Sequence, residues 1–183
     1  HRLRCVLHIA QFAFFKAPMI TAAAMNRLAA ADQAMQFRWV CDRASHGAVR
    51  ALLSAETNAR LELLHWMTQD ALREIYDSSG VFLFPSFFEG FGKAFLEAMS
   101  RGLCVVASDA GGMRDLIDHG RNGCVVPPGD AEGVADAALA IVRDVNRAQA
   151  MSAAAAATAR EHTWERVARE MAAFYEARLR SRV

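Results

Sequence analysis

The amino-acid sequence predicts an α/β fold: a doubly wound, Rossmann-like domain of about six parallel strands with a helical C-terminal extension. Short apolar runs, typical of strands that are covered on both faces, alternate with helical patterns as far as residue 130. This alternation indicates parallel strands that are joined by right-handed helical crossovers. The 183 residues suit one domain, which we divide into an α/β core at 1–130 and the helical extension at 131–183.

The predicted strands are short apolar runs. The first extends from Cys5 to Ala10 and contains His8, which we expect to be buried with its hydrogen bond satisfied. The other strands are expected at residues 37–41, 61–65, 81–84, 104–107 and 123–126. The phenylalanines around the fourth strand are expected to be mostly core: Phe82, Phe84, Phe87, Phe88, Phe91 and Phe95. Three of the four cysteines lie in or beside these runs, which indicates buried thiols in a reducing, cytoplasmic compartment.

The predicted helices are marked by residues that begin or end them. Pro18 can open the first helix, which extends to about residue 31. Thr68 caps another, with Asp70 in its first turn, and Gly80 can end that helix in a left-handed conformation. Asp130 caps the first helix of the extension. Further helices are expected at about 45–56, 92–101 and 113–119, and in the extension at 131–144, 147–160 and 164–181.

Composition and motif content exclude several classes of function. The net charge is +1 and the two signs are interleaved, which argues against a nucleic-acid-binding protein. The cysteines have no metal-ligand spacing, and no Asp-x-Asp occurs, so we expect neither a metal nor another cofactor. A G-x-G-x-x-G after the first strand is absent, which argues against a dinucleotide-dependent dehydrogenase.

The loop after the fourth predicted strand carries the most informative pattern. Residues 85–99 form a glycine-bearing turn that opens a helix, and unpaired N–H groups in the first turn of a helix suit a phosphate. Glu89 precedes the helix and can face the crevice beyond the strands, whereas Glu97 lies at a depth suited to a ribose diol. Alternatively, Glu89 is a solvated loop carboxylate. Glu97, four residues from both Lys93 and Arg101, would then complete a row of surface salt bridges.

The segment 81–130 resembles the C-terminal domain of the retaining glycosyltransferases with the GT-B fold, the large family 4 group. That family carries Pro-Ser, then Glu, Gly, an aromatic or aliphatic residue, Gly, and a second Glu after seven intervening residues. Glu89 and Glu97 match this spacing. The resemblance continues through Gly102, residues 108–112, Gly120, Asn122, Gly123 and residues 127–130.

The resemblance implies retaining transfer of a sugar from a nucleotide diphosphate-sugar donor to a hydroxyl acceptor. Glu97 would then hold the ribose, and Glu89 would contact the hydroxyls of the donor sugar. The backbone of Gly90, Phe91 and Gly92 would hydrogen-bond the sugar and the diphosphate. No enzymic nucleophile is evident, and the leaving phosphate would help to deprotonate the incoming hydroxyl on the front face of the donor.

The loop after the first strand departs from the family pattern. In the family, this loop usually carries Gly-Arg, four further residues and then Lys-Gly, and the Arg and the Lys bind the diphosphate. Lys16 matches the lysine and is the expected catalytic cation, whereas Gln11 replaces the arginine and Ala10 and Ala17 replace the glycines. The alternative for Lys16 is a solvated loop cation. Trp66, after the third strand, is expected either to contact the nucleobase or simply to pack.

Gln11 also favours an alternative function, a non-catalytic module that binds nucleotide sugars. The resemblance implies a further partner, an N-terminal acceptor domain that we expect to be missing from this sequence, which begins at His1. The fragment alone is then expected to be inactive. The basic end of the last helix carries Arg178, Arg180 and Arg182, which suits peripheral contact with anionic lipid or, alternatively, plain solvation.

Overall fold

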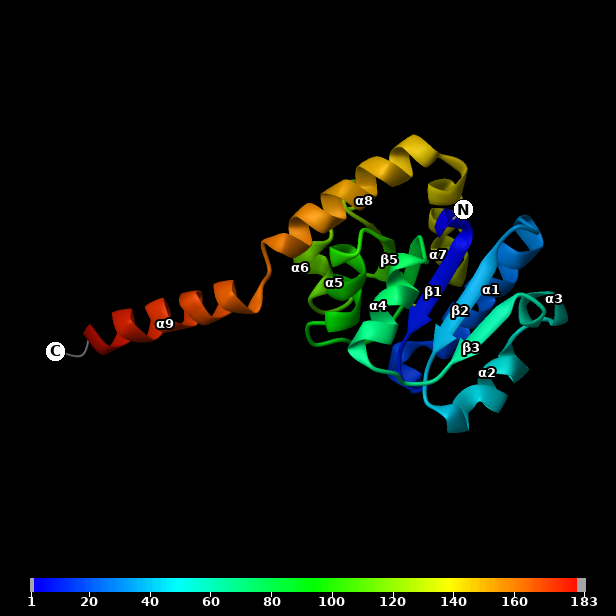
Figure 1. The fold of residues 1–183 in the computed structure, drawn as a ribbon, viewed down its shortest axis with the longest axis horizontal. Helices are drawn as coiled ribbons and strands as arrows, with labels where there is room; N and C mark the ends of the chain where they lie inside the picture. Colours follow the sequence, from blue (N-terminus) through cyan, green and yellow to red (C-terminus); the bar gives the residue numbers. More distant parts are fainter. Residues whose placement is uncertain (1, 181–183) are drawn as a thin grey trace.

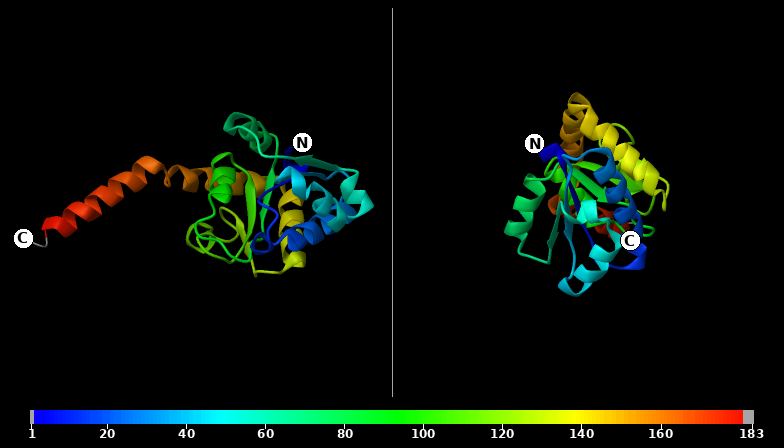
Figure 2. Two further views of the ribbon diagram at one scale, coloured as in Figure 1. Left: turned by 90° about the horizontal axis from the view of Figure 1, so that it is seen from below. Right: turned by 90° about the vertical axis from the view of Figure 1, so that its right-hand side faces the viewer.

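The computed structural model describes residues 2–180 and contains a six-stranded sheet with helices on both faces (Figures 1 and 2). The strands are β1 (Cys5–Ile9), β2 (Gln36–Val40), β3 (Leu61–Leu64), β4 (Val81–Phe84), β5 (Cys104–Ser108) and β6 (Cys124–Val126). Every pairing is parallel, and the order across the sheet is β3-β2-β1-β4-β5-β6. The predicted doubly wound α/β fold is therefore confirmed, and the strand order reverses between β1 and β4.

The helices follow the strands as the sequence predicts. They are α1 (Pro18–Ala31), α2 (His46–Leu52), α3 (Ala55–Asn58), α4 (Gln69–Asp77), α5 (Lys93–Ser100), α6 (Met113–Leu116), α7 (Ala131–Arg143), α8 (Val145–Arg160) and α9 (Trp164–Arg180). Short 3-10 turns add Arg2–Arg4, Phe14–Lys16 and Arg43–Ser45. In Figure 1, α4 and α5 lie in front of the sheet, and α1 and α7 lie behind it.

The sheet separates two hydrophobic cores, because alternate residues of a strand point to opposite faces. The core under α1, α2 and α7 includes Met25, Phe37, Trp39, Val49 and Val134. The core under α4, α5 and α6 includes Leu7, Phe82, Phe84, Phe95, Met99 and Met113. All residues of β1, β4 and β5 are buried, which explains their continuous apolar sequences.

The prediction that the phenylalanines around β4 are core residues is partly wrong. Phe82, Phe84 and Phe95 are buried, but Phe88 is 72% exposed and Phe91 is 47% exposed. Both exposed residues lie in the loop between β4 and α5, beyond the end of the strand.

Capping explains where several helices begin. The Thr68 side chain accepts a hydrogen bond from the N–H of Ala71, and that of Asp130 from Gly133, as capping residues do. The continuous helix predicted at 45–56 is wrong, because Ser54 caps a separate helix, α3.

Gly80 plays a different role from the predicted one. It does not adopt a left-handed conformation, and α4 already ends at Asp77. A Cβ atom on Gly80 would lie 2.4 Å from the Cα atom of Leu3, so a glycine is needed there for close backbone packing. The predicted helix at 113–119 is also shorter, since α6 ends at Leu116.

The last two helices differ in how they pack. α8 lies against α5 and β5, and its Ser152 hydroxyl donates a 2.6 Å hydrogen bond to the carbonyl of Gly102. α9 projects away from the sheet (Figures 1 and 2), and all of its side chains are exposed. None of the helices in residues 2–180 is long and apolar enough to span a bilayer. Arg182, part of the predicted basic end, lies outside the described residues.

Candidate functional site

The loops after β1, β4 and β5 meet at the carboxyl edge of the sheet. β1 pairs with β2 on one side and β4 on the other, so the loops after β1 and β4 leave their strands in opposite directions. Such a reversal of strand order opens a crevice, which is the usual ligand site of open α/β sheets. The candidate residues Lys16 and Glu89 stand on these two loops.

Backbone hydrogen bonds fasten the three loops to one another. The N–H of Phe87, after β4, donates a 2.9 Å hydrogen bond to the carbonyl of Phe15, after β1. The N–H of Gly112, after β5, donates a 2.9 Å hydrogen bond to the carbonyl of Gly90. The loop after β4 is therefore held on both sides.

The two glycines after β5 allow this close approach. Gly111 has a φ of +54°, and a Cβ atom there would lie 2.1 Å from the carbonyl oxygen of Glu89. A Cβ atom on Gly112 would lie 2.9 Å from the carbonyl oxygen of Phe91. The sequence analysis matched these glycines to the family without assigning them this role, although a Gly-Gly pair after a buried strand indicates close backbone contact.

Lys16 and Glu89 form an ion pair between Nζ and Oε1. Their side chains are only 18% and 8% exposed, so neither is the solvated loop charge of the alternative interpretation. The buried hydroxyl of Ser86 donates a 3.1 Å hydrogen bond to the same Oε1 atom of Glu89, and the Ser86 carbonyl accepts one from the hydroxyl of Ser108. Sequence analysis missed this role of Ser86, whose position three residues before Glu89 is the available signal.

The turn that carries Lys16 includes a left-handed residue. Ala17 has φ 53° and ψ 52° and directly precedes α1. Left-handed conformations favour glycine, and the resemblance leads one to expect glycine at this position. Lys16 Nζ also lies 5.5 Å from the ring centroids of Phe15 and Phe84, which places the cation against aromatic faces.

The helix after the glycine turn begins without a side-chain cap. Gly92 is its N-cap residue with φ +78°, and no side chain accepts a hydrogen bond from the first turn of α5. First-turn N–H groups without such an acceptor can bond a ligand or water. Gly90, Phe91 and Gly92 thus lie between Glu89 and the start of this helix.

Glu97, on α5, accepts a 3.1 Å hydrogen bond from the hydroxyl of Tyr76 on α4. Burial, followed by the charge of Glu97, raises the pKa of Tyr76. The predicted alternative, a row of salt bridges, is wrong, because Arg101 pairs with Asp77 and Glu97 pairs with no cation of the described chain. Glu97 also lines an open hollow of about 290 Å³ between α5 and the start of α9, together with Phe91, Leu96, Trp164 and Val167.

Among the described residues, no hydrogen bond or ion pair joins the side chains of Gln11 and Trp66 to Lys16 or Glu89. Gln11 is exposed in the loop directly after β1. Trp66 is 46% exposed and follows β3, the outer strand, which β2 and β1 separate from β4. The structure therefore brings Lys16 and Glu89 together, with Gly90 next to Glu89 in the chain, whereas Glu97 bonds Tyr76 and Trp66 follows the outer strand β3.

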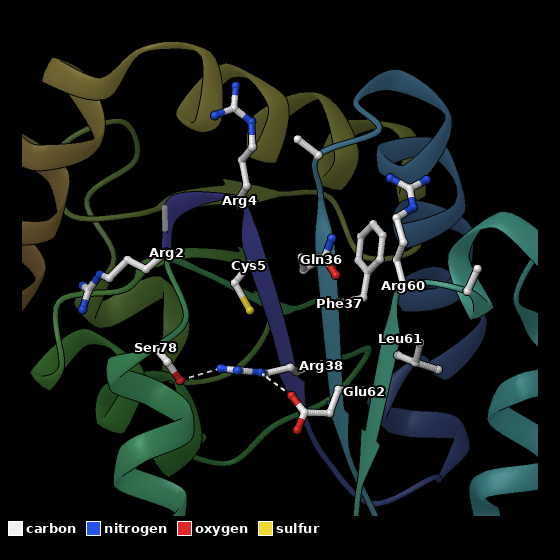
Figure 3. Close-up of a pocket in the computed structure, with 12 residues that line it drawn as sticks. Arg2, Arg4, Cys5, Gln36, Phe37, Arg38, Arg60, Leu61, Glu62 and Ser78 are labelled. Carbon is white, nitrogen blue, oxygen red and sulfur yellow. Dashed lines mark hydrogen bonds and ion pairs between the residues drawn. The ribbon is translucent and has the colours of Figure 1, made fainter.

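A larger hollow of about 930 Å³ lies at the opposite, amino edge of the sheet (Figure 3). It is lined by four arginines: Arg2, Arg4, Arg38 and Arg60. Arg38 bonds Glu62 and Ser78, as Figure 3 shows, and Arg60 donates to the carbonyls of Ala29 and Asp32 near the end of α1. Protein carbonyl, hydroxyl and carboxylate oxygens therefore already accept hydrogen bonds from Arg38 and Arg60.

Comparison with known proteins shows to which family the chain belongs. The family model described as glycosyl transferases group 1 matches residues 4–144, more than half of the chain. The chain belongs to the group 1 glycosyl transferases. It is 37% identical over 108 residues to the lipopolysaccharide core biosynthesis mannosyltransferase LpsB of Rhizobium meliloti, a match that covers 57% of this chain and 31% of that protein. The group 1 chain therefore spans about a third of that relative's length.

Solved structures show the same fold for this group 1 glycosyl transferase chain. Sucrose-phosphate synthase from Thermosynechococcus elongatus matches with a TM-score of 0.82 and 25% identity, over 97% of this chain and 46% of that one. HepE from Anabaena, in complex with UDP and glucose, matches with a TM-score of 0.80 and 20% identity, over 94% and 48%. The C-terminal domain of a group 1 protein, LpcC, from Francisella tularensis matches with a TM-score of 0.75 and 17% identity, over 84% and 83%. The fold is thus that of a Rossmann-like half of the GT-B glycosyltransferases.

Proposed function

We propose that this group 1 glycosyl transferase chain is the donor-binding domain of a retaining enzyme, which transfers a sugar from a nucleotide diphosphate donor to a hydroxyl acceptor. The observation that carries the proposal is the meeting of Lys16 and Glu89 at the reversal of strand order. A cation beside a buried carboxylate suits a ligand with both phosphates and sugar hydroxyls. HepE, which has the same fold, was solved with UDP and glucose.

Each candidate residue then has a role that its position allows. Lys16 binds the diphosphate, and Glu89 accepts hydrogen bonds from sugar hydroxyls. The backbone at 90–92 and the uncapped start of α5 add N–H donors. Glu97, exposed to the hollow beside α5, holds the ribose. Gln11 and Trp66 contact the outer parts of the donor as neutral groups.

Catalysis would be mainly electrostatic. Negative charge develops on the diphosphate as its bond to the sugar breaks, and Lys16 and the N–H groups of α5 would meet that charge, with no metal or cofactor in the proposal. The leaving phosphate deprotonates the acceptor hydroxyl on the same face of the sugar. The four buried, free cysteines favour a reducing compartment such as the cytoplasm.

The acceptor would bind elsewhere in the enzyme. We propose an N-terminal domain of the same protein as the partner, because the solved relatives are about twice as long as the matched part. The exposed apolar residues of α9 provide a surface for such a partner. A peripheral contact of the basic end of α9 with anionic lipid stays part of this proposal.

A Glu97→Gln variant tests the donor site. Glutamine keeps the shape of the side chain but loses the charge that strengthens hydrogen bonds to a ribose diol, so nucleotide affinity should fall by about 1–3 kcal/mol. Calorimetric titration with UDP, GDP and ADP, and with UDP-glucose, GDP-mannose and ADP-glucose, measures this. Glu132→Gln, a charge-matched change of an exposed side chain on α7, should change nothing. Unchanged affinity in Glu97→Gln would remove Glu97 from the site, and no nucleotide binding at all would refute the proposed function.

The neutral residue at Gln11 supports one competing function, a module that binds nucleotide sugars without transferring them. Both functions predict nucleotide binding by this chain. They differ in turnover by the complete protein, so release of nucleoside diphosphate from a bound donor in the presence of acceptor separates them.

A further inference from the structure

The ion pair between Lys16 and Glu89 occupies the cation that the proposed function assigns to the diphosphate. Nζ of Lys16 bonds Oε1 of Glu89 in a place where both side chains are largely buried. The hydroxyl of Ser86 holds the same oxygen at 3.1 Å, so the carboxylate is positioned from two sides. A diphosphate that approaches Lys16 therefore meets a carboxylate already in its place.

We propose that Glu89 competes with the diphosphate for Lys16, and that this competition makes the site favour nucleotide sugars over free nucleoside diphosphates. The inference rests on the proposed function. A free nucleoside diphosphate brings only acceptor oxygens for Lys16, so its binding leaves the Glu89 carboxylate without its cation. A nucleotide sugar also brings hydroxyl donors, which replace the hydrogen bond that Glu89 loses.

Sharing of Lys16 between the two anions is unfavourable. An ammonium group has three protons and can bond a phosphate and a carboxylate together. Both anions would then lie on one nitrogen, roughly 5 Å apart, where little water screens their repulsion. Among the described residues, Lys16 is the cation paired with Glu89, and Gln11 adds no positive charge.

The same competition assists product release. While the sugar is bound, its hydroxyls hold the Glu89 carboxylate away from Lys16. Once the sugar has been transferred, the carboxylate has lost these donors and returns to Lys16. When the Glu89 carboxylate returns to Lys16, it weakens the contact between Lys16 and the nucleoside diphosphate. Glu89 therefore determines the preference of the site for the donor over the product.

A Glu89→Gln variant tests this inference by calorimetry. The amide keeps the size of the side chain and can still bond a hydroxyl, but it no longer neutralises Lys16. Affinity for UDP, GDP or ADP, whichever binds, should rise about fivefold or more, and affinity for the matching nucleoside should not change. The preference for the matching nucleotide sugar over its diphosphate should fall. Circular dichroism checks folding, and Glu89→Ala serves as a second variant if the amide variant is misfolded.

Two comparisons separate competition from general repulsion. Asp109→Asn removes a negative charge after β5 that pairs with Arg114 and should leave nucleotide affinities within about twofold. In a Lys16→Ala background, the gain from Glu89→Gln should disappear; a gain that persists would mean simple repulsion and overturn the inference. Unchanged or weaker diphosphate binding in Glu89→Gln alone also overturns it. No nucleotide binding by any of these proteins, the unchanged chain included, would instead refute the proposed function.

Discussion

At the scale of single residues, burial lowers the pKa of His8, the histidine in β1. His8 is 1% exposed, its Nδ1 donates a 2.9 Å hydrogen bond to the carbonyl of Leu83, and its ring lies edge-on to that of Trp39. Burial lowers the pKa of His8 to about 4; the charge of Lys16 adds to this effect and the hydrogen bond to Leu83 opposes it. The prediction of a buried, hydrogen-bonded histidine is confirmed.

We predict that acidification from pH 6.5 to 4 destabilises the fold through His8. The unfolded chain binds the proton with a pKa near 6.5 and the folded chain only near 4, so the unfolded state is favoured as protons become available. The stabilisation is complete above pH 6.5, and about 2–3 kcal/mol of it is lost by pH 4. Carboxyl groups with lowered pKa values, such as Asp77 beside Arg101, begin to destabilise the fold only below about pH 5, where the unfolded carboxyls start to bind protons.

Urea unfolding at several pH values between 7 and 4.5 measures this dependence. His8→Asn serves as the comparison, since its amide can still donate to the Leu83 carbonyl but does not titrate. The variant should lose the part of the pH slope that corresponds to one proton. An identical slope in both proteins would assign the pH dependence to other groups.

At this scale the sequence could predict the kinds of residue in the site but not their contacts. Lys16 and Glu89 are 73 residues apart and meet only because β1 and β4 are neighbours in the sheet. No local pattern indicates that Arg101 pairs with Asp77 on α4 rather than with Glu97 on its own helix. Spacing along a helix shows which pairs can form, whereas packing between helices decides which do.

At the scale of elements, the loops at the carboxyl edge behave as one packed unit. Gly111 lies so close to the loop after β4 that a side chain at this position would overlap the loop. The elements differ in how well the sequence predicts them. Strands and capped helices follow local patterns, and Ser54 is itself a local capping signal for the break between α2 and α3. The role of Gly80, in contrast, depends on backbone packing against the distant residue Leu3.

We predict that Gly111→Ala shifts the loop that carries Glu89. Its Cβ atom would overlap the Glu89 carbonyl and would also strain a left-handed backbone, so unfolding free energy should fall by roughly 1–3 kcal/mol and nucleotide affinity should fall with it. Gly120→Ala is the matched control, because Gly120 also has a left-handed backbone, with φ +83°, but no atom within 4 Å of the added Cβ. It should show the strain alone, at about 1 kcal/mol, with normal nucleotide binding.

Chemical denaturation and calorimetry of both variants measure the two effects. The difference between Gly111→Ala and Gly120→Ala isolates the contact with the Glu89 loop from backbone strain. Equal nucleotide affinities in the two variants would show that the position of this loop does not affect binding.

At the scale of the whole molecule, α9 is the element of the described chain that projects from the body of the fold. α9 presents large exposed side chains, Trp164, Val167, Met171, Phe174, Tyr175 and Leu179, on a helix that leaves the body of the fold (Figure 1). An apolar surface of this kind marks a site of association. The match to sucrose-phosphate synthase covers 97% of this chain, so it extends into α9, although that protein is about twice as long as the matched part.

The last prediction follows from the proposed function: the 183-residue chain should bind nucleotides but transfer no sugar on its own. In the proposed enzyme the acceptor binds in an N-terminal domain, and loss of that positioning alone removes several kcal/mol of transition-state stabilisation. Release of nucleoside diphosphate from a sugar donor is measured for this chain alone and for this chain joined to an N-terminal domain. Turnover should require the added domain, and rapid turnover by the chain alone would show that the acceptor site lies within these residues.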